Sequence, residues 1–172
     1  VGYNYGQRGM QYVKDKEKYP NRKMLATEST SYVATRGEHK DNPEKGYMSN
    51  FGKGVSWGLQ PGEDWKHIVD YPYLSGTFVW TGFDYIGEPT PYNTKNSYFG
   101  IIDTAGFEKD SFWFYKSVWD IAEEESFIHV SPCYWDFNEG QLIDVLVYSD
   151  LPFIRLHYCG EMYDGKVIDH LT

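Results

Sequence analysis

Two segments of the chain end short apolar runs at side chains that could act on a sugar. Met24–Ser29 places a carboxylate, Glu28, at the end of one run, and Gly76–Pro89 places an indole, Trp80, at the end of another. Strands buried on both faces read as apolar runs, and in barrels of parallel strands the working side chains lie where the strands end. A carboxylate so placed suits chemistry at an anomeric carbon, and an aromatic ring suits stacking against a sugar face.

The composition narrows the class of protein. The 172 residues are 19% aromatic, a surplus that either lines a carbohydrate cleft or fills a tyrosine-rich core. The net charge of −9 argues against a nucleic-acid partner, because phosphates require a basic surface. No apolar run approaches the roughly 20 residues that span a bilayer, so no membrane partner is expected. Cys133 and Cys159 have neither metal-ligand spacing nor the density of a disulfide scaffold.

The elements that must position Glu28 and Trp80 alternate between strand and helix. Strands are expected at 1–5, 24–27 and 77–80, helices at 7–19, 61–71 and 111–124, and a short extended piece at 98–103. This alternation predicts a parallel sheet with right-handed crossovers. The polar stretch Arg36–Gln60 is too long for an ordinary connection, and loops of that length are usually functional or disordered.

After residue 125 the pattern changes to period-two strands, with turns expected at Asn138–Gly140 and at Asp164–Gly165. A boundary near Phe127 divides the chain into 1–126 and 127–172. Three strand–helix units cannot close a barrel that takes eight, and about three strands are too few for a sandwich. The fold class expected is therefore α/β followed by β, as a fragment that holds the end of one domain and the start of the next.

The order and spacing of several short motifs resemble glycoside hydrolase family 2, in its bacterial β-galactosidase branch. The motifs cover nearly the whole chain and are Val1–Tyr5, Leu25–Ser29, Tyr71–Trp80, Thr81–Thr90, Phe99–Phe107, Phe112–Trp119, His129–Trp135 and Val145–Ser149. The resemblance implies that 1–126 are strands 6–8 and their helices from the C-terminal portion of a TIM (β/α)8 barrel. It also implies that 127–172 begin an immunoglobulin-like β-sandwich.

The same resemblance implies roles for single residues. Glu28 matches the nucleophile that forms a covalent glycosyl-enzyme, and Tyr5 matches a tyrosine that orients it. Asn4 and Trp80 match substrate-binding positions, with the indole beneath the sugar. A retaining mechanism also needs an acid/base carboxyl about 5–5.5 Å from the nucleophile. The family takes it from an Asn-Glu pair that would precede Val1, so no turnover is expected from these residues alone.

Three other acidic residues, Asp84, Glu88 and Glu139, each have both a functional and a structural interpretation. Asp84 and Glu88 follow Trp80 and are candidates for binding sugar hydroxyls, although loop acids are usually solvated. Glu88 is also a rival for the second carboxylate. The one Asn-Glu pair in the chain, Asn138–Glu139, lies in an expected turn of the β region. It is therefore not interpreted as the acid/base pair of the family.

The function expected is hydrolysis of terminal β-galactosides. Two alternatives stay open: a β-glucuronidase or other β-glycosidase of the family, and a non-catalytic carbohydrate-binding piece. Ser29–Ser31 stand where some β-galactosidases have an aromatic residue and a histidine, which leaves galactose preference open.

The expected partner is an oligo- or polysaccharide. No cofactor or metal ligand set is visible, and the five histidines show no ligand pairing, while a metal site upstream of Val1 is left open. Homo-oligomerisation is also left open. The sequence does not determine the cellular compartment. The resemblance to the family implies a periplasmic or secreted location.

Overall fold

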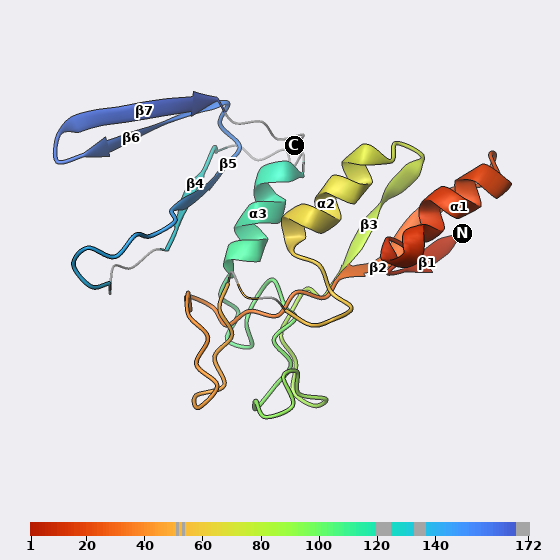
Figure 1. The fold of residues 1–172 in the computed structure, drawn as a ribbon, viewed down its shortest axis with the longest axis horizontal. Coiled ribbons are helices and arrows are strands. Elements are labelled where there is room, and N and C mark those ends of the chain that lie inside the picture. Colours follow the sequence, from red (N-terminus) through yellow and green to blue (C-terminus); the bar gives the residue numbers. More distant parts are fainter. Residues whose placement is uncertain (51, 53, 120–124, 133–136, 168–172) are drawn as a thin grey trace. The chain divides into compact units, whose positions relative to one another are not determined.

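The structure is a computed structural model that describes residues 1–50, 52, 54–119, 125–132 and 137–167 (Figure 1). The chain divides into two compact units, Val1–Phe112 and Trp113–Thr172. The assignment of 1–126 and 127–172 as separate domains stays a prediction.

The first unit is built on a three-stranded parallel sheet. Its strands are β1 (Gly2–Asn4), β2 (Met24–Thr30) and β3 (Leu74–Trp80), in the order β1-β2-β3. The helix α1 (Gln11–Lys18) connects β1 to β2, and α2 (Pro61–Asp70) connects β2 to β3. The predicted alternation of strand and helix is confirmed in this unit.

The two helices begin in different ways. Helix α2 starts with Pro61 in its first turn and a capping box, in which Gln60 N–H donates to Glu63 Oε2 at 3.1 Å. Helix α1 was expected from residue 7. It follows a 3₁₀ turn, η1 (Arg8–Met10), because Gly9 and Met10 take left-handed backbone angles that an α-helix does not use.

Two apolar clusters form the core of the first unit. One joins the sheet to α1 through buried Tyr12, Met24, Ala26 and Leu74. The other lies among the loops and contains Val33, Tyr98 and Phe99.

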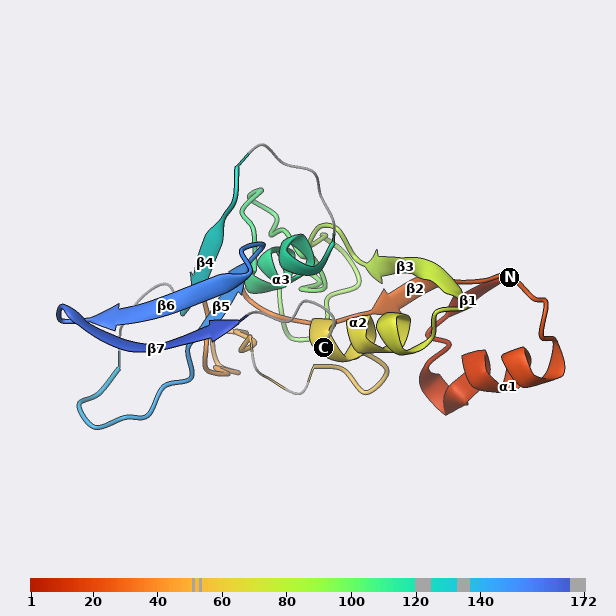
Figure 2. The same ribbon diagram turned by 90° about the horizontal axis from the view of Figure 1, so that it is seen from above.

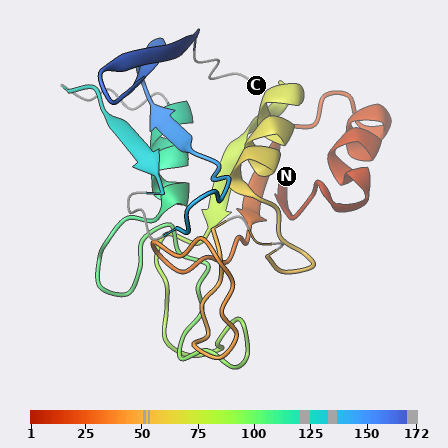
Figure 3. The same ribbon diagram turned by 60° about the vertical axis from the view of Figure 1, so that its left-hand side comes forward.

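Two long loops, residues 31–60 and 81–109, leave the C-terminal ends of β2 and β3 on the same side of the sheet (Figures 1 and 3). The first loop is folded back on itself, since Thr35 N–H donates to the Met48 carbonyl at 2.9 Å. The expected extended piece 98–103 forms isolated bridges instead of a strand, pairing Ile102 with Phe83 and with Glu108. The loops therefore have their own packed framework.

The described part of the second unit contains two antiparallel strand pairs (Figure 2). Strand β4 (Ile128–Ser131) pairs with β5 (Leu146–Ser149), and β6 (Phe153–Tyr158) pairs with β7 (Glu161–Val167). Helix α3 (Asp110–Val118) begins in the first unit and continues into the second. Its predicted extension through 120–124 lies outside the described residues. The predicted change from α/β to β is confirmed at this level.

One of the two predicted turns is correct. Gln141 N–H donates to the Asn138 carbonyl at 3.1 Å, which closes the first turn. The second, at Asp164–Gly165, is wrong because these residues lie inside β7. The hairpin turns at Cys159 and Gly160, whose φ values of 51° and 83° are typical of a tight two-residue hairpin. Among the described residues, no helix combines the length and apolar character needed to cross a bilayer.

Candidate functional site

The parallel register of β1 and β2 places Asn4 beside Glu28. Asn4 Nδ2 donates to Glu28 Oε2 at 3.4 Å, and Asn4 Oδ1 accepts from Thr27 Oγ1 at 2.9 Å. Because a carboxylate only accepts hydrogen bonds, the Nδ2 end of the amide is the one that faces Glu28. Tyr5 N–H donates to the Glu28 carbonyl at 2.8 Å, so the main chain on both strands is tied at this point.

Tyr5 reaches the same carboxylate from the residue after β1. Its backbone is left-handed, with φ of 54°, and its hydroxyl is hydrogen-bonded to Ser31 Oγ. Burial raises the pKa of Tyr5 to about 12; the bond to Ser31 opposes this rise, and hydrogen bonding to Glu28 adds to it. The phenol therefore keeps its proton at neutral pH and can donate it to the Glu28 carboxylate.

The backbone that follows Glu28 is held on both sides. Thr30 and Ser31 have φ values of 68° and 50°, which turn the chain sharply at the end of β2. Ser31 N–H donates to the Trp80 carbonyl at 3.2 Å, and Leu59 N–H donates to the Thr30 carbonyl at 2.7 Å. A Cβ on Gly58 would lie 2.3 Å from the Ser31 carbonyl oxygen, so only glycine allows the returning loop to approach this closely.

A buried polar cluster beneath this turn was not found from the sequence. Asp64 of α2 is 2% exposed, and its Oδ2 accepts from Ser29 Oγ at 2.8 Å and from Thr30 Oγ1 at 3.0 Å. Burial raises the pKa of Asp64, while the hydrogen bonds from Ser29 and Thr30 oppose the rise. By its place in the sequence Asp64 is an acid in the first turn of α2, where a carboxylate complements the helix macrodipole. The sequence signal for its contact with β2 is the pair of adjacent hydroxyl side chains, Ser29 and Thr30, at the end of that strand.

Trp80 lies at the end of β3, in register with Thr30 of β2. Its side chain is 37% exposed, and its ring meets Tyr85 edge-on with the centroids 6.1 Å apart. The indole is thus supported on one edge and keeps exposed area for contact with another molecule.

The two loop acids have different surroundings. Asp84 Oδ1 accepts from Lys109 Nζ at 2.7 Å and from Gly100 N–H at 2.8 Å, with both charged side chains almost fully buried. Glu88 is exposed, and its φ of 43° places it in a turn whose carbonyl accepts from Ser97 Oγ. Sugar binding by either acid stays a prediction, and the carboxylate of Asp84 already has internal partners.

The described residues contain no group of three or more His, Cys, Asp or Glu side chains that could hold a metal ion. The site therefore consists of a carboxylate, Glu28, with an amide and a phenol directed at it and a half-exposed indole on a neighbouring strand. Such an arrangement suits either a charged nucleophile or a binding group for hydroxyls.

No family model matches the chain. It is 35% identical over 167 residues to the β-galactosidase BoGH2A of Bacteroides ovatus, covering 86% of this chain and 19% of that protein. It is 37% identical over 105 residues to a putative β-glucuronidase of Formosa agariphila, covering 56% of this chain and 10% of that protein. The chain thus spans a fifth or less of the length of these curated relatives.

Solved structures agree on the fold. A β-glycosidase from Bacteroides vulgatus aligns with 99% of this chain and 26% of its own, with a TM-score of 0.80 at 23% identity. The resemblance predicted from the sequence motifs is therefore confirmed. The chain corresponds to one segment of the longer β-glycosidases of glycoside hydrolase family 2.

Proposed function

We propose that the chain is part of a retaining exo-β-glycosidase, specifically a β-galactosidase, and that Glu28 is its nucleophile. The observation that carries this proposal is the placement of Glu28 at the C-terminal end of β2, with Asn4 Nδ2 and the Tyr5 hydroxyl directed at its carboxylate. These two donors hold the carboxylate in one orientation.

The reaction proceeds in two displacements. A Glu28 oxygen attacks the anomeric carbon while the glycosidic C–O bond breaks, and an acid/base carboxyl protonates the departing oxygen. The same group then takes a proton from water as the water attacks the anomeric carbon, which releases the sugar and regenerates Glu28. The acid/base is expected on a strand that precedes Val1. Trp80 packs beneath the sugar ring, where its exposed face meets C–H groups.

The architecture proposed for the parent protein follows the same relatives. Residues 1–126 are strands 6–8 of a TIM barrel, and β1–β3 with their intervening helices support this reading because they are parallel and consecutive. Residues 127–172 begin an immunoglobulin-like sandwich, supported by the two antiparallel strand pairs. A periplasmic or secreted address is part of the same proposal.

A β-glucuronidase is the second candidate. It is supported by the 37% identity over 105 residues to a protein named a putative β-glucuronidase, beside the 35% identity over 167 residues to a β-galactosidase. Ser29 and Thr30 are buried and bonded to Asp64, so neither reaches a sugar at the position where some relatives have larger side chains.

The test is covalent labelling of the full-length natural protein with 2-deoxy-2-fluoro-β-galactosyl fluoride, followed by intact-mass analysis and peptide mapping. Fluoride leaves without a general acid, so the label depends on the nucleophile. We expect one added sugar on Glu28, and Glu28→Gln should abolish labelling and reduce kcat by at least about 10³-fold. Labelling by the glucuronyl analogue instead would select the second candidate.

Two variants complete the test. Glu17→Gln changes an exposed glutamate of α1 and is the matched control, which should label normally. Glu88→Gln examines the rival carboxylate. Full activity of Glu28→Gln, or a label mapped to Glu88, would overturn the assignment.

A further inference from the structure

Glu28 lies in a β-bulge of β2, the central strand of the parallel sheet. Ala26 is paired with Thr77 of β3. The next pair along the two strands joins Ser29 to Val79, so β2 advances three residues where β3 advances two. The register with β1 shifts at the same place, because β2 advances two residues, from 26 to 28, beside one step of β1. Both shifts are those of a bulge, in which one strand carries an extra residue.

The bulge changes the face of β2 on which Glu28 lies. Met24 and Ala26 are each 1% exposed and belong to the apolar cluster that the sheet shares with α1 and α2. Side chains of a regular strand alternate between faces, so residue 28 would join them against the helices. Ser29 takes that place instead, since it is fully buried and bonded to Asp64 of α2. The extra residue therefore moves Glu28 to the opposite face.

The hydrogen bonds of Asn4 support the same geometry. Its Oδ1 accepts from Thr27 Oγ1 at 2.9 Å, and its Nδ2 donates to Glu28 Oε2 at 3.4 Å. Consecutive residues of a regular strand point to opposite faces, so they would not share one partner. The bulge turns the side chains of Thr27 and Glu28 the same way, toward Asn4.

A chain of side-chain hydrogen bonds crosses the bulge from β3 to α2. Ser29 Oγ lies 2.8 Å from Asp64 Oδ2 and 3.4 Å from the Phe78 carbonyl, so its one proton goes to the nearer oxygen. Ser29 Oγ then accepts from Thr77 Oγ1, which is 2.5 Å away. Among the described residues, the Thr77 hydroxyl has no other hydrogen-bond partner. The donors therefore run in one direction, from Thr77 to Ser29 and from Ser29 to Asp64.

We infer that Thr77 and Ser29 are positioning residues that hold the bulge and keep Glu28 on the face from which it attacks a sugar. Thr77 is paired with Ala26, which precedes the bulge, and its hydroxyl bonds to Ser29, which follows it. This bond closes the strand over the extra residue. The inference rests on the proposed function, since it takes Glu28 as the nucleophile. It predicts that loss of the bond slows the attack, which depends on the exact placement of the carboxylate, more than it weakens binding of the sugar on Trp80.

The rate of covalent labelling tests the inference, because it separates attack from binding. The full-length natural protein is incubated with increasing concentrations of 2-deoxy-2-fluoro-β-galactosyl fluoride, or of the glucuronyl analogue if only that one labels it. Intact mass followed over time gives a maximal labelling rate constant, which reports attack by Glu28, and an inhibition constant, which reports binding of the sugar.

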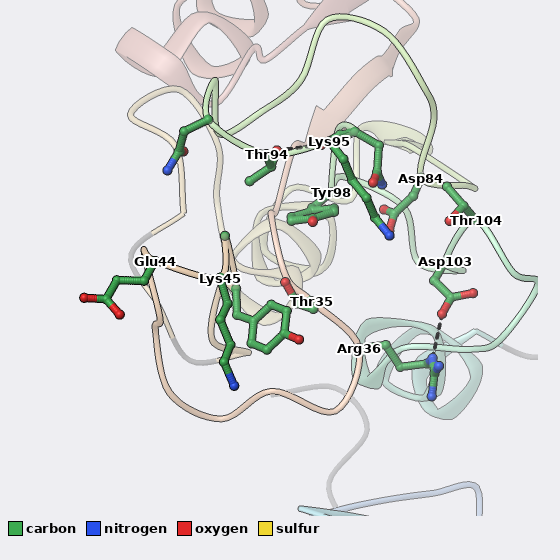
Figure 4. A pocket seen from close by; sticks show the side chains of 14 residues that line it. Thr35, Arg36, Glu44, Lys45, Asp84, Thr94, Lys95, Tyr98, Asp103 and Thr104 are labelled. Carbon is green, nitrogen blue, oxygen red and sulfur yellow. Dashed lines mark hydrogen bonds and ion pairs between the residues drawn. The ribbon is translucent and has the colours of Figure 1, made fainter.

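The variants differ in whether they keep the hydroxyl on β3. Thr77→Val removes it and keeps the branched shape, whereas Thr77→Ser keeps it. Thr104→Val is the matched control, at an exposed threonine in a pocket of about 530 Å³ between the two loops (Figure 4). Glu28, Ser29 and Thr77 are not among the residues that line this pocket.

Thr77→Val should lower the maximal labelling rate constant about tenfold and leave the inhibition constant within about twofold. Thr77→Ser and Thr104→Val should keep both constants within about twofold. Ser29→Ala should give a loss like that of Thr77→Val, and the second substitution should add little to the first, because Thr77 acts through Ser29.

A lower melting temperature of Thr77→Val with an unchanged labelling rate constant would show a purely structural role and overturn the inference. A loss that Thr77→Ser does not restore, or that stays undiminished in the Ser29→Ala background, would overturn it as well. Each of these results leaves the proposed function standing. Failure of the unaltered protein to take up either label would contradict the proposed function, and the positioning roles would fall with it.

Discussion

The residues around Glu28 form a short chain of hydrogen bonds. The hydroxyl of Tyr5 lies between Ser31 Oγ and the Glu28 carboxylate, and a tyrosine hydroxyl has only one proton to donate. If that proton goes to Glu28, the tyrosine oxygen accepts from Ser31. Ser31 is 1% exposed and is fixed by its main-chain bond to Trp80, so it acts on Glu28 only through Tyr5.

Substitution of Tyr5 and Ser31 should therefore give graded losses. A hydrogen bond to a charged group contributes about 1.5–3 kcal/mol and a neutral one about 0.5–1.5 kcal/mol. We expect Tyr5→Phe to lower kcat about 10- to 100-fold and Ser31→Ala about two- to tenfold, with small changes in KM. Steady-state kinetics on an aryl glycoside would measure both, with Ser75→Ala at an exposed β3 position as the control.

A double-mutant cycle separates a positioning role of Ser31 from a purely structural one. In the Tyr5→Phe background, Ser31→Ala should cost little further activity, because the hydroxyl through which it acts is gone. An undiminished loss in that background would show that Ser31 acts by another route.

Single residues at strand ends were predictable, and their distant partners were not. Glu28 and Trp80 stand out in the sequence because each ends an apolar run. Asp84 looked like a solvated loop acid, yet it forms a buried ion pair with Lys109, 25 residues further along the chain. No local pattern marks a partner at that separation, since it depends on how the loop of residues 81–109 folds back on itself.

At the scale of elements, α2 determines where β2 ends. Its buried Asp64 accepts from Ser29 and Thr30, the two residues that follow Glu28. Ser29 Oγ also lies 2.5 Å from Thr77 Oγ1, so the same cluster joins β2 to β3. The helix thereby fixes the main chain of the candidate nucleophile relative to its neighbouring strand.

The raised pKa of Asp64 predicts a pH-dependent stability. The folded protein keeps a proton on Asp64 at pH values where the unfolded chain has released it. The resulting stabilisation is complete below the ordinary carboxyl pKa of 3.8 and is lost as the pH rises through the folded-state pKa. Asp64→Asn keeps an acceptor oxygen and does not titrate, so the melting temperature of the unaltered protein relative to this variant should fall as the pH rises from 3.8 toward neutrality.

Thermal unfolding across that pH range would measure the difference. Asp70→Asn, at the exposed end of the same helix, is the matched control. A difference in melting temperature between the unaltered protein and the Asp64→Asn variant that stays constant with pH would contradict the prediction.

The elements themselves were largely readable from the sequence, with errors at their ends. Apolar runs and the Pro61 start located the strands and α2, because these signals are local. Helix α1 begins later than expected at Gln11, and the last hairpin turns at Cys159, a residue that seldom adopts a positive φ. In each case the backbone conformation departs from what the residue type favours.

At the scale of the whole chain, the first unit depends on loops as much as on its sheet. The loop cluster of Val33, Tyr98 and Phe99 is a second core, and Lys109 lies beside it with Nζ bonded to both loops. Buried charge costs stability unless it is paired, and here the pair and two carbonyls satisfy the ammonium group. The bonds from Lys109 Nζ to Asp84 and to the Ala34 carbonyl therefore join the two loops into one framework.

Breaking this pair should loosen the loops selectively. Lys109→Met leaves Asp84 buried without its cation, and removing one partner of a buried pair typically costs about 3–5 kcal/mol. We expect limited proteolysis of the full-length natural protein to cut within residues 35–47 and 84–104 much faster in this variant. Lys109→Met combined with Asp84→Leu should slow the cleavage again, because no unpaired charge then remains buried. Lys66→Met, which breaks only an exposed pair on α2, should leave the cleavage rate unchanged, and equal cleavage in the Lys109 and Lys66 variants would show that the loops do not depend on the buried pair.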